Sequence, residues 1–261
     1  SPYPLDDIRV QPGSESDGTS PAKKEPDAAA VVKNMTDAEI ASALATYLDG
    51  LAKDDKFSGV VLIAKDGKPV FEKAYGLADK AKNIPNNNET KFNLGSMNKM
   101  FTAVAIAQLV ETGKLAFDDK VGKHLPDYPN KDVANKVTIH HLLTHTSGLG
   151  SYWNARFDAK RASIKTVADY LALFADEPLR FEPGQRFEYS NSGFIVLGAI
   201  IAKVSGQCYY AYVPEHIYTP AGMKNTDAYE ASVATPNLDM GYTTGGEDKT
   251  DGPRQENTAT R

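Results

Sequence analysis

Apolar residues recur at helical spacing where the chain first becomes rich in hydrophobic positions. Thr36 and Glu39 have the T-x-x-E spacing of a capping box. The apolar residues that follow fall on one helical face: Ile40, Leu44, Tyr47, Leu48 and Leu51. The pattern therefore predicts an amphipathic helix at the start of the globular part, which begins near Met35.

A β-hairpin is predicted next, at about residues 58–76. Two runs rich in β-branched and aromatic residues flank Asp66-Gly67 in the sequence SGVVLIAKDGKPVFEKAYG. An Asp-Gly pair between two such runs is the strongest short-range hairpin signal. Its apolar residues imply a sheet larger than two strands, because an isolated hairpin is marginal in water.

The pattern is mostly helical from about residue 96 to residue 220. We predict helices at 96–112, 139–144, 164–175, 192–204 and 207–218. Gly95-Ser96 stands where the first of these should begin, and Gly113 supplies its C-terminal stop. Pro214 falls inside the last, and an interior proline costs about 3 kcal/mol unless the helix kinks or restarts. We therefore expect a break near Val213.

The ends of the chain differ in composition from its centre. Residues 1–34 are rich in Pro, Ser, Asp, Gly and Lys, which is typical of a linker or tail. After residue 225 the sequence is polar and rich in Gly and Thr. We therefore predict a tail at 1–34 and one domain at 35–261. That domain comprises the start of a sheet lobe (35–95), a helical lobe (96–225) and a polar segment (226–261).

Composition excludes several classes of protein. The chain has 41% hydrophobic and 24% charged residues, as an ordinary globular protein has. A net charge of -5 argues against a nucleic-acid partner, because there is no basic patch to release counterions. No stretch approaches the roughly 18 apolar residues of a membrane span. The one cysteine, Cys208, excludes an internal disulfide framework, and we expect it to be a small buried residue.

The sequence SMNK places a serine and a lysine at the start of an apolar helix. The helix needs burial, but a lysine resists it, so the lysine needs an explanation. Lys99 lies three residues after Ser96, so its side chain points back over the same face. Burial would disfavour its ammonium form. A serine hydroxyl at a helix N-terminus beside such an amine is a nucleophile with a base at hand. The alternative is a capping serine and a lysine that extends into solvent.

A second pair of residues points to the same chemistry. Tyr189 and Asn191 are two residues apart just before another apolar helix, and in extended backbone such residues face the same way. A phenol near a lysine can pass protons, and the amide can hydrogen-bond a substrate carbonyl and the lysine. The alternative is a core tyrosine followed by a helix-capping asparagine.

Three segments occur together in a characteristic order: SMNK (96–99), TIHHLLTHTSGL (138–149) and PGQRFEYSNSGFIVLGAII (183–201). In this combination, residues 35–245 resemble the serine β-lactamase and penicillin-binding protein superfamily. The resemblance is closest to the class C branch, with its D-alanyl-D-alanine carboxypeptidases, D-amino-acid peptidases and β-lactamase-like carboxylesterases. It implies an α/β (α+β) fold: an antiparallel sheet flanked by helices plus a mostly helical lobe, with Ser96 at their junction.

The resemblance also implies roles for matching residues. Ser96 would be the acylated nucleophile, Lys99 would take or relay its proton, and Tyr189 would act as base and then as acid. Asn191 would hold the substrate and order the lysine. The Ser96 backbone N–H would be half of an oxyanion hole, and such a donor is typically worth about 3 kcal/mol. The expected substrates are carboxylesters or small peptides and amides with D-residues, with β-lactams as at least slow acylating agents and with neither cofactor nor metal.

Other residues have two interpretations each. Tyr152 and Trp153 follow the central motif, and the resemblance suggests that they form a substrate-binding wall on the acyl side; packing within the lobe is the alternative. His141 and His145 are four residues apart and His140 adjoins them. No H-E-x-x-H pattern or carboxylate accompanies them, so we expect structural roles.

The family's third motif is not found in this sequence. TTGG at 243–246 carries neither the lysine nor the histidine of that motif, and it directly follows NLDMGY, which resembles a segment upstream of the motif. In the resembling family, further strands and a closing helix follow the helical lobe. We therefore expect a C-terminal remainder of the same domain beyond Arg261, without which Ser96 would be largely inactive. The alternative function is a catalytically silent scaffold or ligand-binding relative. Because relatives are often exported in bacteria, we expect a periplasmic or secreted protein.

Overall fold

The computed structural model describes residues 35–228, 234–243 and 255–256. The chain divides into two compact units between Tyr47 and Leu48. The predicted tail at 1–34 lies outside the described residues, and so does most of the TTGG sequence.

The first helix, α1, spans Asp37–Lys53 and begins as predicted. Thr36 donates its backbone N–H and its hydroxyl to Glu39 Oε2 at 2.7 and 2.8 Å, and the Glu39 N–H returns to Thr36 Oγ1 at 3.3 Å. The capping box is therefore confirmed. Of the predicted apolar face only Leu48 is buried within the described residues, since Ile40 and Tyr47 are 39% and 62% exposed.

The predicted hairpin is present. Strands β1 (Gly59–Lys65) and β2 (Lys68–Tyr75) pair antiparallel, with a bulge between Ile63 and Ala64. Asp66 and Gly67 have φ angles of 50° and 74°, as a tight hairpin turn requires. Strands β3 (Leu77–Asp79) and β4 (Ile84–Pro85) form a second antiparallel pair, and β5 (Tyr242–Thr243) and β6 (Gln255–Glu256) a third. Helices and antiparallel strands together confirm the predicted fold class.

The two long central helices lie where the pattern placed them. The 3₁₀ turn η2 (Gly95–Asn98) leads into α2 (Lys99–Glu111), and Gly113 ends this region with a φ of 69°. Helix α8 spans Asn191–Ser205, and α5 spans Ile139–Leu143. The prediction at 164–175 was too long, because α7 covers only Val167–Leu171. Four short helical segments were not predicted: α3 (Val121–His124), α4 (Lys131–Lys136), α6 (Ala155–Lys160) and η3 (Arg161–Ser163).

Pro214 divides the last helical segment, as expected. Helix α9 (Tyr209–Val213) ends there, and a π-helical turn, η4 (Pro214–Tyr218), follows. Proline has no N–H for an intrahelical bond, so the regular α-helical ladder cannot pass through it. The prediction for Cys208 was wrong, because this residue is exposed. It occupies the N-cap position of α9, where the chain turns at the surface.

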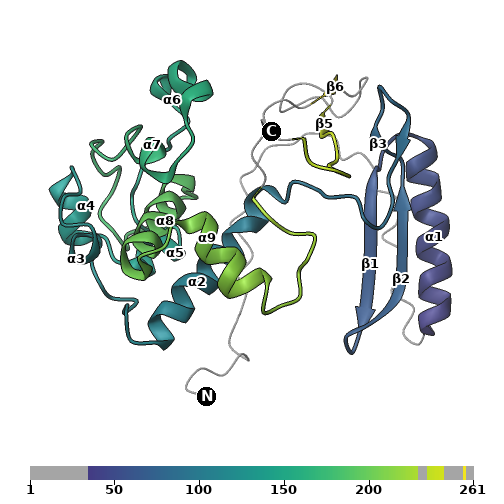
Figure 1. The fold of residues 1–261 in the computed structure, drawn as a ribbon, viewed down its shortest axis with the longest axis horizontal. Helices are drawn as coiled ribbons and strands as arrows, with labels where there is room; N and C mark the ends of the chain where they lie inside the picture. The colour runs from purple at the N-terminus through teal and green to yellow at the C-terminus, as the bar shows by residue number, and fades with distance from the viewer. Residues whose placement is uncertain (1–34, 229–233, 244–254, 257–261) are drawn as a thin grey trace, which may run out of the picture. The chain divides into compact units, whose positions relative to one another are not determined.

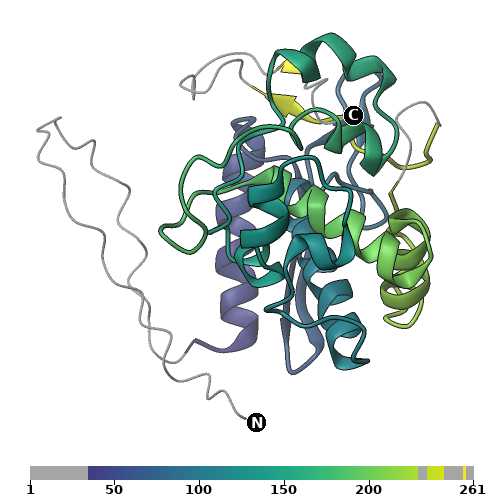
Figure 2. The ribbon, with the colours of Figure 1, turned by 90° about the vertical axis from the view of Figure 1, so that its left-hand side faces the viewer.

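Helix α8 is the centre of the helical core. It contacts α2, α3, α5, α7 and α9, and Figures 1 and 2 show these neighbours grouped around it. Val196, Leu197, Ile200 and Ile201 of α8 are fully buried, as is Ile106 of α2. At roughly 1.5–3 kcal/mol for each buried aliphatic side chain, this contact fixes α2 against α8. This packing also fixes the first residues of α2 relative to the first residues of α8.

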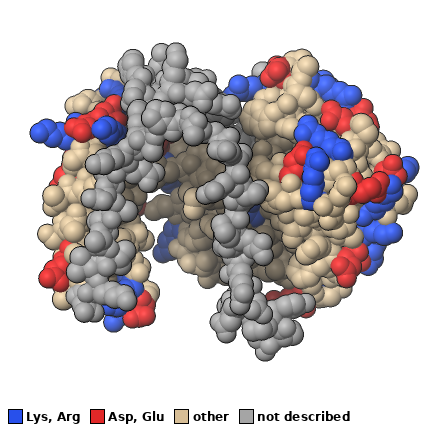
Figure 3. Space-filling model, turned by 180° about the vertical axis from the view of Figure 1, so that it is seen from behind, with Lys and Arg blue, Asp and Glu red and all other residues tan. Residues whose placement is uncertain are grey.

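Charged side chains do not gather by sign on the face seen in Figure 3. Over its described residues, Lys and Arg alternate with Asp and Glu. In the described part of the chain no single helix is long and apolar enough to cross a membrane. Helix α8 and the segment Tyr209–Tyr218 meet such a test of length and composition only as a pair bent by 77°.

Candidate active site

Ser96 lies on η2, directly before α2. Gly95 has a φ of 53°, in the left-handed region that glycine enters without a Cβ penalty, and its N–H donates to Asn93 Oδ1 at 2.8 Å. The turn that follows presents the Ser96 side chain at the surface. Neither η2 nor α2 has a side-chain cap. Ser96 is therefore not a capping serine.

Four side chains meet at the starts of α2 and α8. Tyr189 Oη donates to Ser96 Oγ at 2.6 Å, and Lys99 Nζ donates to the same oxygen at 3.1 Å. Lys99 Nζ also donates to Asn191 Oδ1 at 2.7 Å. The structure thus brings together Ser96, Lys99, Tyr189 and Asn191, which the sequence placed up to 95 positions apart.

Lys99 is half-buried rather than buried, so the expectation of a fully desolvated lysine was wrong. The ammonium group of Lys99 lies 4.9 Å from the ring centre of Tyr189 and 5.6 Å from that of Phe194. Both distances suit cation–π attraction. The ammonium group therefore has two aromatic faces, the serine oxygen and the Asn191 amide oxygen around it.

The surroundings of Tyr189 favour its ionised form. Burial raises the pKa of Tyr189, but hydrogen bonding with Lys99 and Ser96 and the positive charge of Lys99 together lower it below the usual 10.0. The phenol nevertheless remains 48% exposed. The Tyr189 hydroxyl is therefore accessible to substrate while it contacts the serine oxygen.

The alternative role of Asn191 as a helix cap is excluded. Ser190 is the N-cap of α8, and its side chain accepts the Gly193 N–H at 3.1 Å. Asn191 is the first helical residue, and its amide oxygen is the Lys99 acceptor. The extended conformation of Ser190 makes Tyr189 and Asn191 project toward the same side, as the i, i+2 spacing predicted.

His145, for which the sequence predicted a structural role without placing it at this site, lies next to Tyr189. Its ring centre lies 4.5 Å from that of Tyr189, and its Nδ1 accepts the Ser190 N–H at 3.1 Å. Burial and the charge of Lys99 lower the pKa of His145. The signal was the segment THTSGL, in which His145 adopts a φ of 57°. His141, in contrast, joins Thr138 in a capping box at the start of α5.

A cavity of about 170 Å³ adjoins Lys99 and Asn191. Its wall is mostly apolar or aromatic and includes Phe194 and Ile195 of α8 together with Tyr152. Tyr152 thus lines the cavity next to Lys99 and Asn191, and its role in substrate binding stays a prediction. Trp153 does not line this cavity; it is 51% exposed and stacks on Tyr152 at 5.1 Å.

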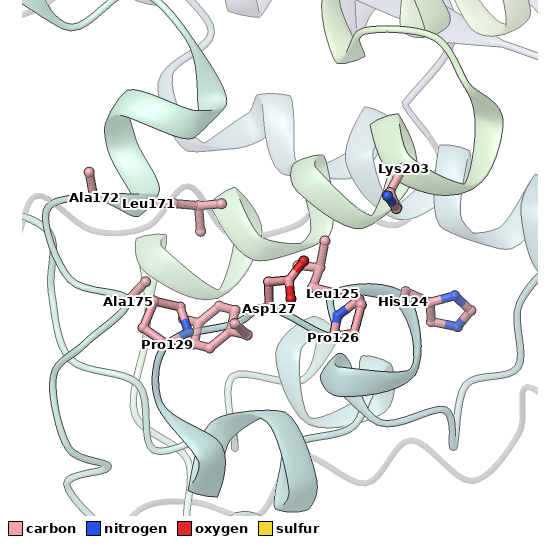
Figure 4. Close-up of a pocket in the computed structure, with 10 residues that line it drawn as sticks. His124, Leu125, Pro126, Asp127, Pro129, Leu171, Ala172, Ala175 and Lys203 are labelled. Carbon is pink, nitrogen blue, oxygen red and sulfur yellow. The ribbon is translucent and has the colours of Figure 1, made fainter.

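A second cavity, of about 290 Å³, lies apart from these residues. Figure 4 shows its lining, from the segment between α3 and α4, from α7 and the turn after it, and from Lys203 of α8. None of the four site residues contributes to it. Among the described residues, no three His, Cys, Asp or Glu side chains form a group that could hold a metal ion.

The family model described as Beta-lactamase matches residues 43–260, so the chain belongs to the β-lactamase family. The predicted resemblance to serine β-lactamases and penicillin-binding proteins is confirmed.

Three relatives show how the chain compares with known proteins. It is 34% identical to penicillin-binding protein 4* of Bacillus subtilis (strain 168) over 75% of this chain and 43% of that protein. It is also 34% identical to esterase EstB of Burkholderia gladioli, over 72% of this chain and 51% of EstB. A penicillin-binding protein from Bacillus halodurans superposes with a TM-score of 0.68 at 36% identity, over 80% of this chain and 63% of that chain. The chain thus spans about half the length of these two curated relatives or less.

Proposed function

We propose that this chain carries the nucleophile of a serine hydrolase that forms an acyl-enzyme on Ser96. One observation carries the proposal: the Ser96 hydroxyl lies within hydrogen-bond distance of both a lysine and a tyrosine. A nucleophile and its base within such reach are the signature of covalent catalysis. The family supports hydrolase chemistry, since its members include penicillin-binding proteins and an esterase.

Acylation follows from the contacts. Ser96 Oγ attacks the substrate carbonyl carbon, and its proton passes across the 2.6 Å contact to the Tyr189 phenolate. The hydrogen bond and positive charge of Lys99 lower the pKa of Tyr189 and so favour formation of that phenolate. As the tetrahedral intermediate collapses, the bond to the leaving group breaks and Tyr189 returns the proton to it. The product of this half-reaction is an ester on Ser96 and a free alcohol or amine.

Deacylation reverses the roles with water as the nucleophile. Tyr189 takes a proton from water, the hydroxide adds to the ester carbonyl, and Ser96 leaves with the proton that Tyr189 returns. Asn191 keeps Lys99 in place through the 2.7 Å hydrogen bond. The Ser96 backbone N–H stabilises the oxyanion, because the first N–H groups of a helical segment have no acceptor within it.

The cavity beside the site supports one substrate class over the other. Its apolar and aromatic wall fits a compact apolar acyl group, and EstB is an esterase. We therefore place carboxylesters first. Peptides or amides with D-residues and β-lactams come second, supported by the similarity to penicillin-binding proteins. A catalytically silent binding protein is the remaining alternative.

Full activity is proposed to need further strands of the same domain. Met97, Met100 and Val104 form a stripe along η2 and α2 that is 43–63% exposed, and Leu62 of β1 is 59% exposed. Within the described residues, β1 pairs with β2 alone. Additional strands would cover this apolar surface and supply the second oxyanion donor.

Intact-mass measurement tests the proposal. The protein is incubated separately with a fluorophosphonate and with a penicillin, and the adduct is located by peptide mapping. We expect one adduct on Ser96 that is lost in Ser96→Ala, while the matched surface variant Ser42→Ala still reacts. An adduct on Ser147, Ser190 or Ser192 would contradict the assignment. Failure of the folded protein to react, both alone and in a longer protein that includes the further strands, would favour the silent relative.

A further inference from the structure

His145 holds the backbone on both sides of Tyr189. Its carbonyl oxygen accepts the N–H of Glu188 at 2.9 Å, and its ring nitrogen Nδ1 accepts the N–H of Ser190 at 3.1 Å. One residue, from the loop after α5, therefore binds the backbone N–H of the residue before the tyrosine and that of the residue after it. Ser190 is only 4% exposed, so its N–H has little access to water as another acceptor.

The ring of His145 also contacts the side chain that this backbone carries. It lies 4.5 Å from the Tyr189 ring at an interplanar angle of 33°, and 5.2 Å from the Phe194 ring. Phe187 meets it edge-on at 5.8 Å. The His145 ring thus packs against the Tyr189 ring and is itself packed against two phenylalanine rings. The Tyr189 hydroxyl contacts Ser96.

We propose that His145 is a positioning residue that holds the Tyr189 phenol against Ser96 through hydrogen bonds to the backbone N–H groups of Glu188 and Ser190 and through ring contact. This inference rests on the proposed function of Tyr189 as the proton-transfer group. A 2.6 Å contact from a half-exposed side chain requires a rigid backbone, because catalysis is sensitive to misplacement of about 1 Å.

Few residues could replace His145. Its φ of 57° is a left-handed conformation, which His, Asn and Asp adopt more readily than most non-glycine residues. As an acceptor at Nδ1, the neutral imidazole carries its proton on Nε2. Asparagine combines tolerance of the same backbone with an acceptor oxygen near the position of Nδ1, but it lacks the ring. Glycine adopts the backbone and lacks both.

The experiment compares His145→Asn with His145→Gly, since both variants tolerate the backbone and differ in the acceptor. The probe is the rate of fluorophosphonate labelling at Ser96. We expect His145→Gly to slow labelling by at least about tenfold, because a phenol displaced by about 1 Å can lose up to about 10²-fold in rate. His145→Asn should restore labelling to within about threefold of the wild type. His140→Asn, at an exposed neighbour on α5, is the matched control and should label at the wild-type rate.

A second measurement does not depend on Ser96 reacting. The Tyr189 phenol is titrated by NMR, with Tyr189→Phe to assign its signal. Wild-type and His145→Asn proteins should titrate below the ordinary tyrosine range, and His145→Gly nearer to it, because the phenol then leaves Lys99 and Ser96. Equal titrations in all three, or labelling of His145→Gly at the wild-type rate, would overturn the inference. If wild-type Ser96 never reacts, the proposed function fails, but the titration still decides the role of His145.

Should His145→Gly fail to fold, the wild-type protein provides the answer. The ¹⁵N resonance of Nδ1 should be that of an unprotonated nitrogen, coupled across a hydrogen bond to the Ser190 N–H. A protonated Nδ1 at pH 7 would overturn the inference.

Discussion

Replacing Tyr189 by phenylalanine removes one oxygen atom from the centre of the site. The ring remains, and with it the contacts to His145 at 4.5 Å and to the Lys99 ammonium at 4.9 Å. The 2.6 Å contact of the hydroxyl with Ser96 Oγ is lost, together with the interaction of the hydroxyl with Lys99. The substitution therefore tests the hydroxyl alone.

The expected loss of rate is large and the expected loss of stability is small. A positioned base or acid contributes typically 10²–10⁴-fold, or about 3–5 kcal/mol of activation free energy. The side chain is 48% exposed, so water can replace much of the lost hydrogen bond. We expect the free energy of unfolding to fall by less than about 1 kcal/mol.

The assay measures the rate of Ser96 labelling by a fluorophosphonate as a function of pH. In the wild type the rate should rise with pH as the phenolate forms, with a midpoint below 10.0, because the pKa of Tyr189 is lowered. In Tyr189→Phe this rise should disappear together with at least 99% of the rate, which corresponds to the lower limit of about 10²-fold. Tyr47→Phe, at a tyrosine 62% exposed on α1, is the control. A Tyr189→Phe protein that labels within threefold of the wild type would refute the assignment of Tyr189 as the base.

Two further predictions concern stability and specificity. Burial opposes ionisation of Asp119, but hydrogen bonds from Lys123 and His124 prevail and lower its pKa from 3.8 to about 2. Its stabilisation is therefore present above about pH 4 and is lost as the pH falls toward 2. Urea denaturation should show Asp119→Asn about 1–2 kcal/mol less stable at pH 7, with the difference closing toward pH 2; a constant difference would contradict this. Tyr152→Ala should change the KM ratio between long and short acyl esters, whereas Trp153→Ala, outside the cavity, should not; equal effects would contradict the proposed wall.

Much of the fold could be predicted because some signals are local. Asp66-Gly67 fixes a turn by backbone preference alone, and Pro214 ends a helix by lacking an N–H. Helices α3, α4 and α6 have only four to six residues, too few for a hydrophobic period to be read. Two of them depend on a capping side chain at a single position, Asn130 for α4 and Asn154 for α6. Such helices are determined by local hydrogen bonds and by packing that a periodicity analysis does not register.

Part of the candidate site could likewise be predicted from local signals, and part of it could not. Ser96 with Lys99, and Tyr189 with Asn191, each follow from short spacings, and the resemblance joined the two pairs. The sequence predicted a structural role for His145, but its place beside Tyr189 could not be predicted from spacing, because that place depends on a left-handed backbone and on partners more than 40 positions away. The burial of Lys99 was overestimated because its helix is apolar on nearly every face, while one face is exposed in the described residues.

The candidate site forms only when α2 packs against α8, so the reactivity of Ser96 indicates whether this step of folding is complete. The hydrogen bond between Ser96 and Tyr189 joins residues 93 positions apart, so it closes a long loop and cannot form before the two helices dock. Reactivity at Ser96 should therefore appear late in refolding, together with burial of the α8 core rather than with helix formation. Pulses of an active-site reagent during refolding would thus time the docking of these two helices, using chemistry in place of a spectroscopic label.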